Sequence, residues 1–120
     1  METWEAILTR RSVREYTDRP VEEELLDNLC EAARWAPSGL NNQPWRFMKV
    51  TDRGTIEELS RLTRYRGVVA GAAALIAVFL DNGEVYDRTK DLMSAGAAFQ
   101  NILLAAHDAG LGAYWLGEIL

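Results

Sequence analysis

Cysteine and histidine are nearly absent from this chain of 120 residues, which contains one residue of each type. Cys30 has no second thiol with which to form a disulfide or a thiolate metal cluster, a composition typical of proteins from reducing compartments. No group of His, Cys and Asp residues has the spacing of metal ligands. For the single histidine, His107, a hydrogen-bonded or surface position is commoner than a catalytic one. We therefore predict no metal site.

The chain also lacks a long apolar segment and an excess of basic residues. Its longest apolar run, Val68–Leu80, is shorter than the roughly 20 residues of a membrane-spanning helix. The N-terminal segment Met1–Thr9 contains Glu2 and Glu5 and no apolar run, which argues against a targeting peptide, so we expect a cytoplasmic protein. The 18 acidic and 13 basic residues give a net charge of -5, which disfavours binding to nucleic acid or to an anionic membrane.

The composition, 48% hydrophobic and 26% charged, is that of one globular domain over residues 1–120. Apolar residues recur at helical spacing in four segments, and aromatic and branched residues gather in three others. One of the latter, Ala73–Leu80, is so uniformly apolar that we expect a central strand buried on both faces. The predicted order is helix, helix, strand, helix, strand, helix, strand, over Thr3–Thr9, Val21–Trp35, Trp45–Val50, Thr55–Leu62, Ala73–Leu80, Val85–Ala109 and Ala113–Leu116.

The predicted helix Val85–Ala109 is apolar around most of its circumference. Its middle contains two strongly polar residues, Gln100 and Asn101. Such a helix must be covered on most sides, and a chain of this length has little material with which to cover it. We therefore predict a homodimer, in which the small residues Gly96, Ala97 and Ala98 permit close approach of the partner.

Three segments carry residues suited to a planar, phosphorylated ligand. The first, Arg10–Arg14, is densely cationic in an acidic protein, and in an extended chain Arg10, Ser12 and Arg14 point to one side. Two guanidinium groups and a hydroxyl suit a phosphate and an electron-rich ring edge. A solvated charged turn explains the same composition equally well, and both interpretations stay open.

The second segment, Ala36–Trp45, joins a predicted helix to a predicted strand. Two prolines and a glycine restrict its backbone, and the amides of Asn41, Asn42 and Gln43 offer paired donors and acceptors for the edge of a heterocycle. Turns of this composition more often satisfy their own hydrogen bonds. The third segment, Gly110–Gly117, combines glycines that allow close backbone approach with an aromatic wall, and a plain core strand has the same pattern.

In this order and spacing, the three segments resemble the nitroreductase family. The matching strings are Arg10–Tyr16, Ala36–Phe47 and the alanine-rich helix that leads to Gly110, Leu111 and Gly112, so that the resemblance extends over essentially the whole chain. It implies an α+β fold, a three-layer α/β/α sandwich with a central mixed sheet flanked by helices. It also implies FMN bound at the interface of a homodimer.

By this resemblance, each FMN contacts three sets of residues. The first segment supplies phosphate ligands and a cation at the pyrimidine edge of the ring, the opposite subunit supplies a loop, and the third segment supplies a backbone wall. In that order the residues are Arg10, Arg11 and Ser12 with Arg14; then Pro37, Ser38, Gly39 and Asn41 with the supporting Gln43; then Leu116 and Gly117.

The resemblance further implies an oxidoreductase in which NAD(P)H delivers a hydride to the flavin N5 atom. A nitroaromatic, a quinone or a similar small acceptor then takes the electrons in a ping-pong cycle. A cation at Arg14 would stabilise the negative charge of the reduced ring. No side-chain nucleophile or general base is required, so we predict no catalytic residue.

The chain departs from the family pattern at its end. Family members usually continue past the position of Leu120 with basic residues near the phosphate and a segment that embraces the partner subunit. A fragment, a split gene product and a naturally short relative are the alternatives. Two competing hypotheses follow, a non-catalytic flavin-binding dimer module and a helical interaction domain with an incidental arginine turn.

Overall fold

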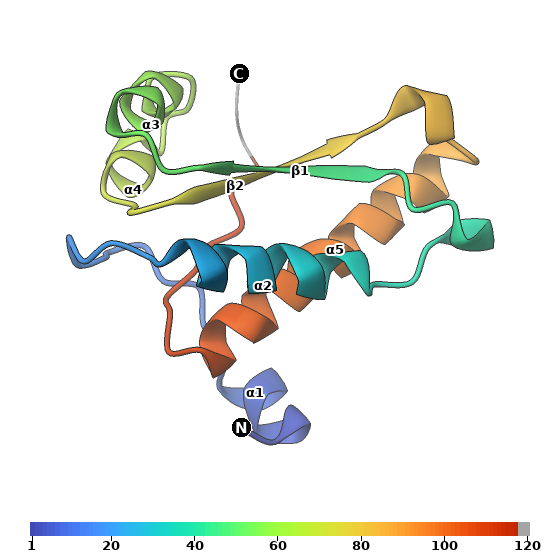
Figure 1. Cartoon of the computed structure of the whole chain (residues 1–120), viewed down its shortest axis with the longest axis horizontal. Coiled ribbons are helices and arrows are strands. Elements are labelled where there is room, and N and C mark those ends of the chain that lie inside the picture. Colours follow the sequence, from blue (N-terminus) through green and yellow to red (C-terminus); the bar gives the residue numbers. More distant parts are fainter. Residues whose placement is uncertain (118–120) are drawn as a thin grey trace.

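The computed structural model describes residues 1–117 and has an α+β fold, as predicted. Figure 1 shows a narrow sheet with two long helices beneath one face and two smaller helices at one end. The helices are α1 (Thr3–Thr9), α2 (Glu23–Arg34), α3 (Arg53–Ser60), α4 (Arg66–Ala70) and α5 (Arg88–Asp108), the strands are β1 (Trp45–Val50) and β2 (Leu75–Leu80), and two short 3-10 turns are η1 (Gly39–Asn41) and η2 (Asn82–Glu84). Of these helices, the sequence analysis did not predict α4.

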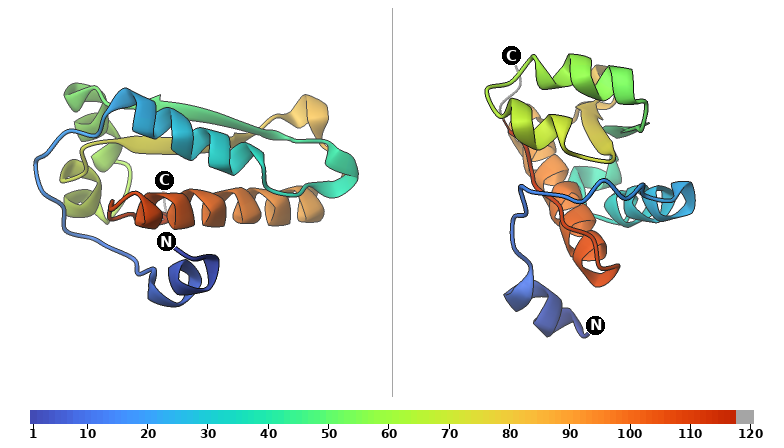
Figure 2. Two further views of the ribbon diagram at one scale, coloured as in Figure 1. Left: turned by 60° about the horizontal axis from the view of Figure 1, so that its bottom comes forward. Right: turned by 90° about the vertical axis from the view of Figure 1, so that its left-hand side faces the viewer.

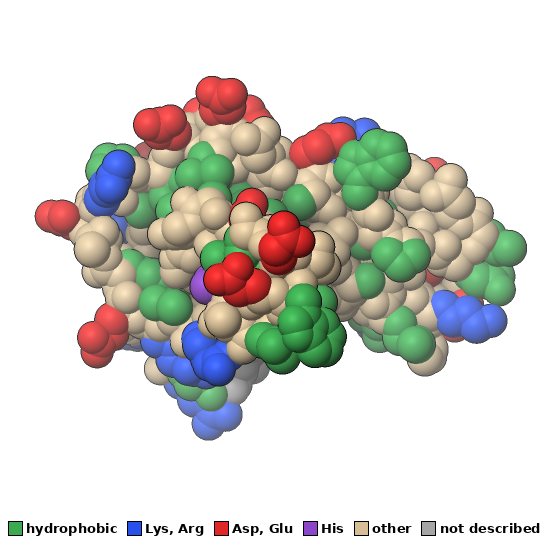
Figure 3. Space-filling view, turned by 90° about the horizontal axis from the view of Figure 1, so that it is seen from below, with side chains coloured by type: hydrophobic (Ala, Val, Ile, Leu, Met, Phe, Trp, Pro, Cys, Tyr) green, Lys and Arg blue, Asp and Glu red, His purple; other side chains and the backbone are tan. Residues whose placement is uncertain are grey.

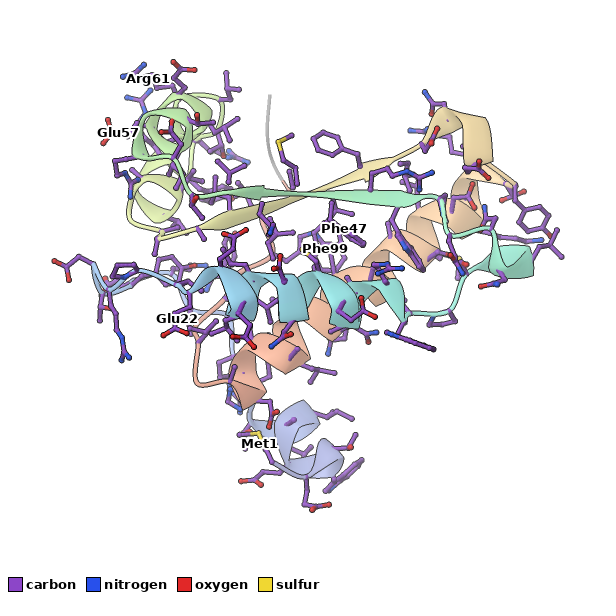
Figure 4. The ribbon with its side chains drawn as sticks, viewed as in Figure 1. Met1, Glu22, Phe47, Glu57, Arg61 and Phe99 are labelled. Atoms are coloured by element: carbon purple, nitrogen blue, oxygen red, sulfur yellow. The ribbon has the colours of Figure 1, made fainter. Side chains whose placement is uncertain are left out.

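The two strands pair antiparallel, from Trp45 opposite Leu80 to Val50 opposite Leu75. Alternate side chains of a strand point to opposite faces, and one face, which includes Trp45, joins the core with α2 and α5. Figure 4 shows Phe47 of β1 and Phe99 of α5 in the layer between the strands and the helices. At one end of the two-stranded sheet, Val50 packs instead with residues of α3 and α4.

The prediction of a central strand buried on both faces is wrong for β2. Within residues 1–117, β2 pairs with β1 alone, and Phe79 on its outer face stays 49% exposed. Met48 of β1 lies on the same outer face and is 50% exposed. An apolar run in the sequence indicates a strand, but it does not indicate how many faces of that strand are covered by other elements.

The predicted strand Ala113–Leu116 is also wrong. It forms one isolated parallel bridge, between Ser12 and Ala113. The hydroxyl of Tyr16 donates a hydrogen bond to the carbonyl oxygen of Val13, so that a side chain occupies an acceptor that a continuing ladder would use. Within residues 1–117 the pairing of these two segments is limited to this one bridge.

The two long helices pack along each other beneath the sheet. Asn101 of α5 donates from its side-chain amide to the carbonyl oxygen of Ala32 in α2 at 2.9 Å. Their contact surface consists of small and branched apolar side chains, which are Leu26, Leu29 and Ala33 of α2 and Ala98, Ile102 and Ala106 of α5. Close packing of this kind fixes how the two ends of α5 lie relative to the sheet.

The small residues in the middle of α5 serve packing within the chain. A Cβ atom at Gly96 would lie 3.6 Å from the Trp115 ring, which stacks on Phe99 with ring centroids 4.3 Å apart. Ala98 is completely buried in the contact with α2. Our expectation that these positions serve the approach of a partner subunit is therefore wrong for Ala98. For the half-buried Gly96 and Ala97 it stays a prediction, as does the dimer itself.

Helix α1 lies apart from the other elements, beside the C-terminal end of α5 (Figure 2). The N-terminal ammonium of Met1 pairs with Asp108 at 3.1 Å, and the Thr9 hydroxyl lies 2.8 Å from the His107 Nε2 atom. Of its own side chains, Ala6 alone is buried. No helix within residues 1–117 combines the length and the apolar character needed to cross a membrane.

Candidate functional site

The end of α5 brings the first and third segments together. Gly110 adopts a positive φ of 80°, which ends the helix, and the Leu111 amide donates back to the Ala106 carbonyl oxygen at 2.8 Å. The chain then runs beside the arginine segment, where the Val13 amide donates to the Ala113 carbonyl oxygen at 3.0 Å. Residues separated by about a hundred positions in sequence thus form one surface.

Gly112 is required for this contact. A Cβ atom at this position would lie 2.7 Å from Cγ1 and 2.9 Å from Cβ of Val13, closer than side chains approach each other. We predicted that the glycines of the third segment allow a close approach of its backbone. At Gly112, the group that approaches the backbone is Val13 of the first segment. Leu116 packs its side chain beside Val50, Ile56 and Val69, and Gly117 is exposed.

Two guanidinium groups of the first segment are available to an anion. Within residues 1–117, no carboxylate pairs with Arg10 or Arg14. The Arg14 guanidinium lies over the Tyr114 ring, 4.5 Å from its centroid, and the Ser12 side chain is exposed. Burial raises the pKa of Tyr16 above its ordinary value, while the Arg14 cation opposes that rise, so Tyr16 is a neutral hydroxyl donor at pH 7.

Arg11 has a different environment from its neighbours. Its Nη1 atom donates to the carbonyl oxygens of Leu8 at 2.9 Å and Arg10 at 2.7 Å, at the C-terminal end of α1. A cation here satisfies carbonyl groups that the helix leaves unpaired. The structure therefore places Arg11 at a helix end.

A cavity of about 110 Å³ lies between the arginine segment and α5. Its walls include Arg10, Val13, Leu103 and His107. His107 is hydrogen-bonded to Thr9, as expected for a histidine with a structural role. Within residues 1–117, no three His, Cys, Asp or Glu side chains gather in a way that would hold a metal ion.

The second segment forms a loop with unusual backbone geometry. Leu40, Asn41 and Gln43 have positive φ values of 54°, 55° and 48°. Residues with side chains other than Asn and Asp rarely adopt this region, and such strain is commonest at binding sites. The loop satisfies some of its own hydrogen-bonding groups. The backbone nitrogen of Gln43 donates to Ser38 Oγ at 3.1 Å, and the Gln43 side-chain amide donates to Asn41 Oδ1 at 2.9 Å.

Sequence reasoning named Asn42 among the amides of this loop but missed the residues to which Asn42 fastens it. Asn42 donates from its side-chain amide to Asp91 Oδ1 and to the Glu84 carbonyl oxygen, both at 2.9 Å. Asp91 is completely buried, and its second oxygen accepts from the Tyr86 amide at 3.0 Å. The available signal was an acidic residue near the start of the predicted helix Val85–Ala109, and this signal alone does not identify the partner of Asp91.

The loop and the arginine segment lie at opposite ends of α5. The loop is fastened near Asp91, whereas Arg10 and Val13 lie beside His107. The helix between Asp91 and His107 spans about 24 Å at about 1.5 Å per residue, and Figure 1 shows the two regions well separated. The two predicted halves of the site therefore do not meet within one copy of the chain.

Large apolar side chains are exposed near the loop and on α1. Trp35 is 79% exposed and Leu40 80%, and on α5 the nearby Met93 is 70% exposed. Trp4 of α1 is 71% exposed. Figure 3 shows hydrophobic side chains gathered in several places on the face viewed from below. Large exposed apolar side chains of this kind are candidates for burial against a partner.

Comparison with protein families gives one clear match. Residues 7–65 and 54–120 match the sequence model of the Nitroreductase family. A protein of Methanothermobacter thermautotrophicus, provisionally named NADH dehydrogenase/NAD(P)H nitroreductase, is 41% identical over 98% of this chain. The chain spans 61% of the length of that relative.

Solved structures agree with the family match. A protein from Desulfovibrio desulfuricans, crystallised in complex with FMN, superposes with a TM-score of 0.90 at 51% identity, over 96% of this chain and 67% of its own. The NADPH:FMN oxidoreductase of Vibrio harveyi, solved with NAD⁺, gives a TM-score of 0.81 at 29% identity, over 92% of this chain and 53% of its own. The predicted resemblance is thus confirmed.

Proposed function

Because this chain belongs to the nitroreductase family, we propose that it binds FMN and transfers electrons from NAD(P)H to a small acceptor. The observation that carries the proposal is the pair of guanidinium groups, Arg10 and Arg14, which have no carboxylate partner within residues 1–117. In a protein of net charge -5, two cations left free beside a closely packed backbone segment are suited to an anionic ligand.

The residues fit the chemistry of FMN. Arg10 and Ser12 offer a cation and a hydroxyl for the phosphate, and Arg14 offers a cation for the pyrimidine edge of the ring. When bound, FMN would supply hydride and electron transfer, which no side chain of the site performs. Arg14 would stabilise negative charge at that edge and favour reduction, and Tyr114 would hold the Arg14 guanidinium in place.

We propose that the complete site is formed by two copies of the chain. Pro37, Ser38, Gly39 and Asn41 are too far from Arg10 and Arg14 to contact the same flavin within one copy, since α5 separates the two regions. In a homodimer, the loop of one subunit would complete the site of the other. The exposed Trp35, Leu40 and Met93 support such an assembly, because burial in a partner would remove them from water.

Titration of the purified chain with FMN, followed by flavin fluorescence, tests the proposal. We expect saturable binding in the wild type and an affinity lowered about tenfold or more in Arg14→Ala, since a charge-assisted contact is lost. Arg61→Ala, which removes an exposed cation of the same type beside α3, is the matched control (Figure 4). Absence of flavin uptake by the wild type would overturn the proposal.

Reduction of the bound flavin by NADH or NADPH then distinguishes an oxidoreductase from a flavin-binding module without turnover. Bleaching of the flavin absorbance by either nucleotide, followed by recovery on addition of a quinone or a nitroaromatic, supports an oxidoreductase with a ping-pong cycle. Bound flavin that neither nucleotide reduces supports a flavin-binding module without turnover.

A further inference from the structure

Asp91 is a completely buried carboxylate without a cationic partner within residues 1–117. A buried charge is costly unless hydrogen bonds compensate it. Here both oxygens are occupied, one by the Asn42 side-chain amide at 2.9 Å and the other by the Tyr86 backbone amide at 3.0 Å. Its place in the first turn of α5 also favours a negative charge. The two carboxyl oxygens of Asp91 are thus held by donors from two separate segments.

Asn42 is fixed by this arrangement. Its amide nitrogen donates to Asp91 and to the Glu84 carbonyl oxygen, so both of its hydrogens are used. Because both neighbours are acceptors, the amide has one favourable orientation. Its Oδ1 atom is buried and finds no hydrogen-bond partner among residues 1–117, a cost that the two donated bonds must offset. Asn42 therefore fastens the loop to the body of the protein.

Tyr86 sets the distance between the loop and the segment that precedes α5. A Cβ atom at Gly39 would lie 2.8 Å from two carbon atoms of the Tyr86 ring, so the ring and the Gly39 backbone are in direct contact. The Tyr86 backbone amide is itself held by Asp91. Asp91 thus fastens both sides of the contact, Tyr86 directly and the loop through Asn42.

The loop needs such a support because its own conformation is unfavourable. Leu40, Asn41 and Gln43 all have positive φ values, and strained residues persist only where the surroundings hold them. The bonds from Gln43 to Ser38 and Asn41 lie within the loop and do not position it relative to the protein. Positioning depends on Asn42, on the Tyr86 contact and on Arg46, whose guanidinium donates to the Gln43 carbonyl oxygen at 3.2 Å.

We infer that Asp91 is a positioning residue of the flavin site, which holds residues 38–43 in their ligand-binding conformation through Asn42 and Tyr86. The inference rests on the proposed function, since it treats Ser38, Gly39 and Asn41 as groups that contact FMN. Asp91 itself touches no part of the ligand surface, because it is completely buried.

Two variants break the arrangement at different points. Asp91→Asn keeps the shape but replaces one acceptor oxygen by an amide that faces an N–H donor, so one of two hydrogen bonds is lost. Asn42→Ala removes both bonds from the loop side. Ser94→Ala is the matched control, since Ser94 is buried one turn later on α5 and donates only to the Lys90 carbonyl oxygen.

Two measurements are made on each variant. Without flavin, hydrogen exchange at the amides of residues 41–43 should accelerate in Asp91→Asn and Asn42→Ala, while exchange in α2 stays slow. With flavin, the FMN dissociation constant should rise about tenfold or more in both variants. In the double variant the rise should be smaller than the product of the two single effects, because both substitutions remove the bond between Asn42 and Asp91. Ser94→Ala should match the wild type in both measurements.

Unchanged loop exchange together with unchanged FMN affinity in Asp91→Asn and Asn42→Ala would overturn the inference. Strictly additive effects in the double variant would also overturn it, because the bond between Asp91 and Asn42, which both substitutions remove, would then contribute nothing. If Asp91→Asn does not fold, Asn42→Ala decides. If the wild type fails to bind FMN, the proposed function fails, and loop exchange still shows whether Asp91 holds the loop.

Discussion

The guanidinium of Arg14 lies over the ring of Tyr114, with its central carbon 4.5 Å from the ring centroid. This contact joins the arginine segment to the chain that follows α5, next to the bridge between Ser12 and Ala113. It also restricts a long and otherwise free side chain. A cation that is oriented before its ligand arrives loses less conformational entropy on binding.

Replacement of Tyr114 by leucine should therefore weaken FMN binding. A cation–π contact at a partly exposed site contributes about 0.5 to 1 kcal/mol, so we expect the FMN dissociation constant to rise about two- to fivefold. Tyr114→Phe keeps the ring and should bind FMN nearly as the wild type does. Flavin fluorescence titration measures both, and equal affinities for the two variants would contradict the orienting role.

Gly112→Ala should destabilise the protein through a clash with Val13. The added Cβ atom would lie 2.7 Å from the Val13 Cγ1 atom, and overpacking of this kind costs about 1 to 3 kcal/mol of unfolding free energy. Val13→Ala removes the clashing methyl groups, so the double variant should recover part of the loss. Urea unfolding measures the cycle, and strictly additive effects of the two substitutions would show that the residues do not interfere.

The long helices could be predicted from sequence because each buries a regular apolar stripe. Leu26, Leu29 and Ala33 recur at helical spacing and are all buried in α2. The strand positions were harder, since Ala113–Leu116 looks like a strand by composition but meets a partner segment for one bridge only. Pairing depends on what lies opposite, which the local sequence does not contain.

For the site, the sequence indicated which segments matter but not which residues support them. Arg10, Ser12 and Arg14 were named from their spacing and their types, and they do lie beside the third segment. Asp91 was missed because its partner Asn42 lies 49 positions away. A contact between positions so distant leaves no periodic signal in a single sequence.

Replacement of Lys49 by methionine should make Cys30 less reactive at neutral pH. Burial raises the pKa of the Cys30 thiol, and the nearby Lys49 cation acts in the opposite direction. Loss of that cation should raise the thiol pKa further and shift the pH profile of alkylation to higher pH. Both side chains line an open cavity of about 360 Å³, which gives a small reagent access.

The matched change is Glu23→Gln, because the Glu23 carboxylate contributes to the rise in the Cys30 pKa. We expect its alkylation profile to shift to lower pH than that of the wild type. Iodoacetamide rates measured across the alkaline range give both profiles. A shift in the same direction for the two variants would indicate a change in access and would contradict the electrostatic explanation.

Asp52 should stabilise α3 in a manner that depends on pH. Its carboxylate accepts from the Thr55 hydroxyl at 2.7 Å and the Thr55 amide at 2.9 Å, and these bonds lower its pKa below the ordinary value of 3.8. A carboxyl whose pKa is depressed on folding contributes stability above its unfolded pKa and loses it as the pH falls through the folded value. Asp52→Ala should therefore lower the Tm at pH 7, and the difference should shrink below pH 3.8.

Asp52→Asn separates the cap from the charge. Asparagine also accepts at the N-cap position, so this variant should keep most of the stability at pH 7. Its difference from Asp52→Ala should not depend on pH, because neither side chain titrates. Thermal unfolding followed by circular dichroism at several pH values gives the comparison, and a constant difference between wild type and Asp52→Ala would contradict the titration.

A site shared between subunits should be restored by mixing two defective variants. Arg14→Ala damages the arginine segment and Asn41→Ala damages the loop, so each homodimer should bind FMN weakly at both of its sites. In a random mixture half of the dimers are mixed, and each mixed dimer has one undamaged site, so about a quarter of the wild-type capacity should return. Co-refolding of the two variants, followed by FMN titration, measures this recovery.

The reverse mixture tests the same geometry with the opposite outcome. When the wild type is mixed with a chain that carries both substitutions, every site of a mixed dimer contains one damaged half. Capacity should then fall to about a quarter of that of the wild type, because wild-type homodimers alone retain undamaged sites. A site contained within one subunit would instead keep about half of the capacity in this mixture and would recover nothing in the first, since neither variant chain carries both undamaged halves.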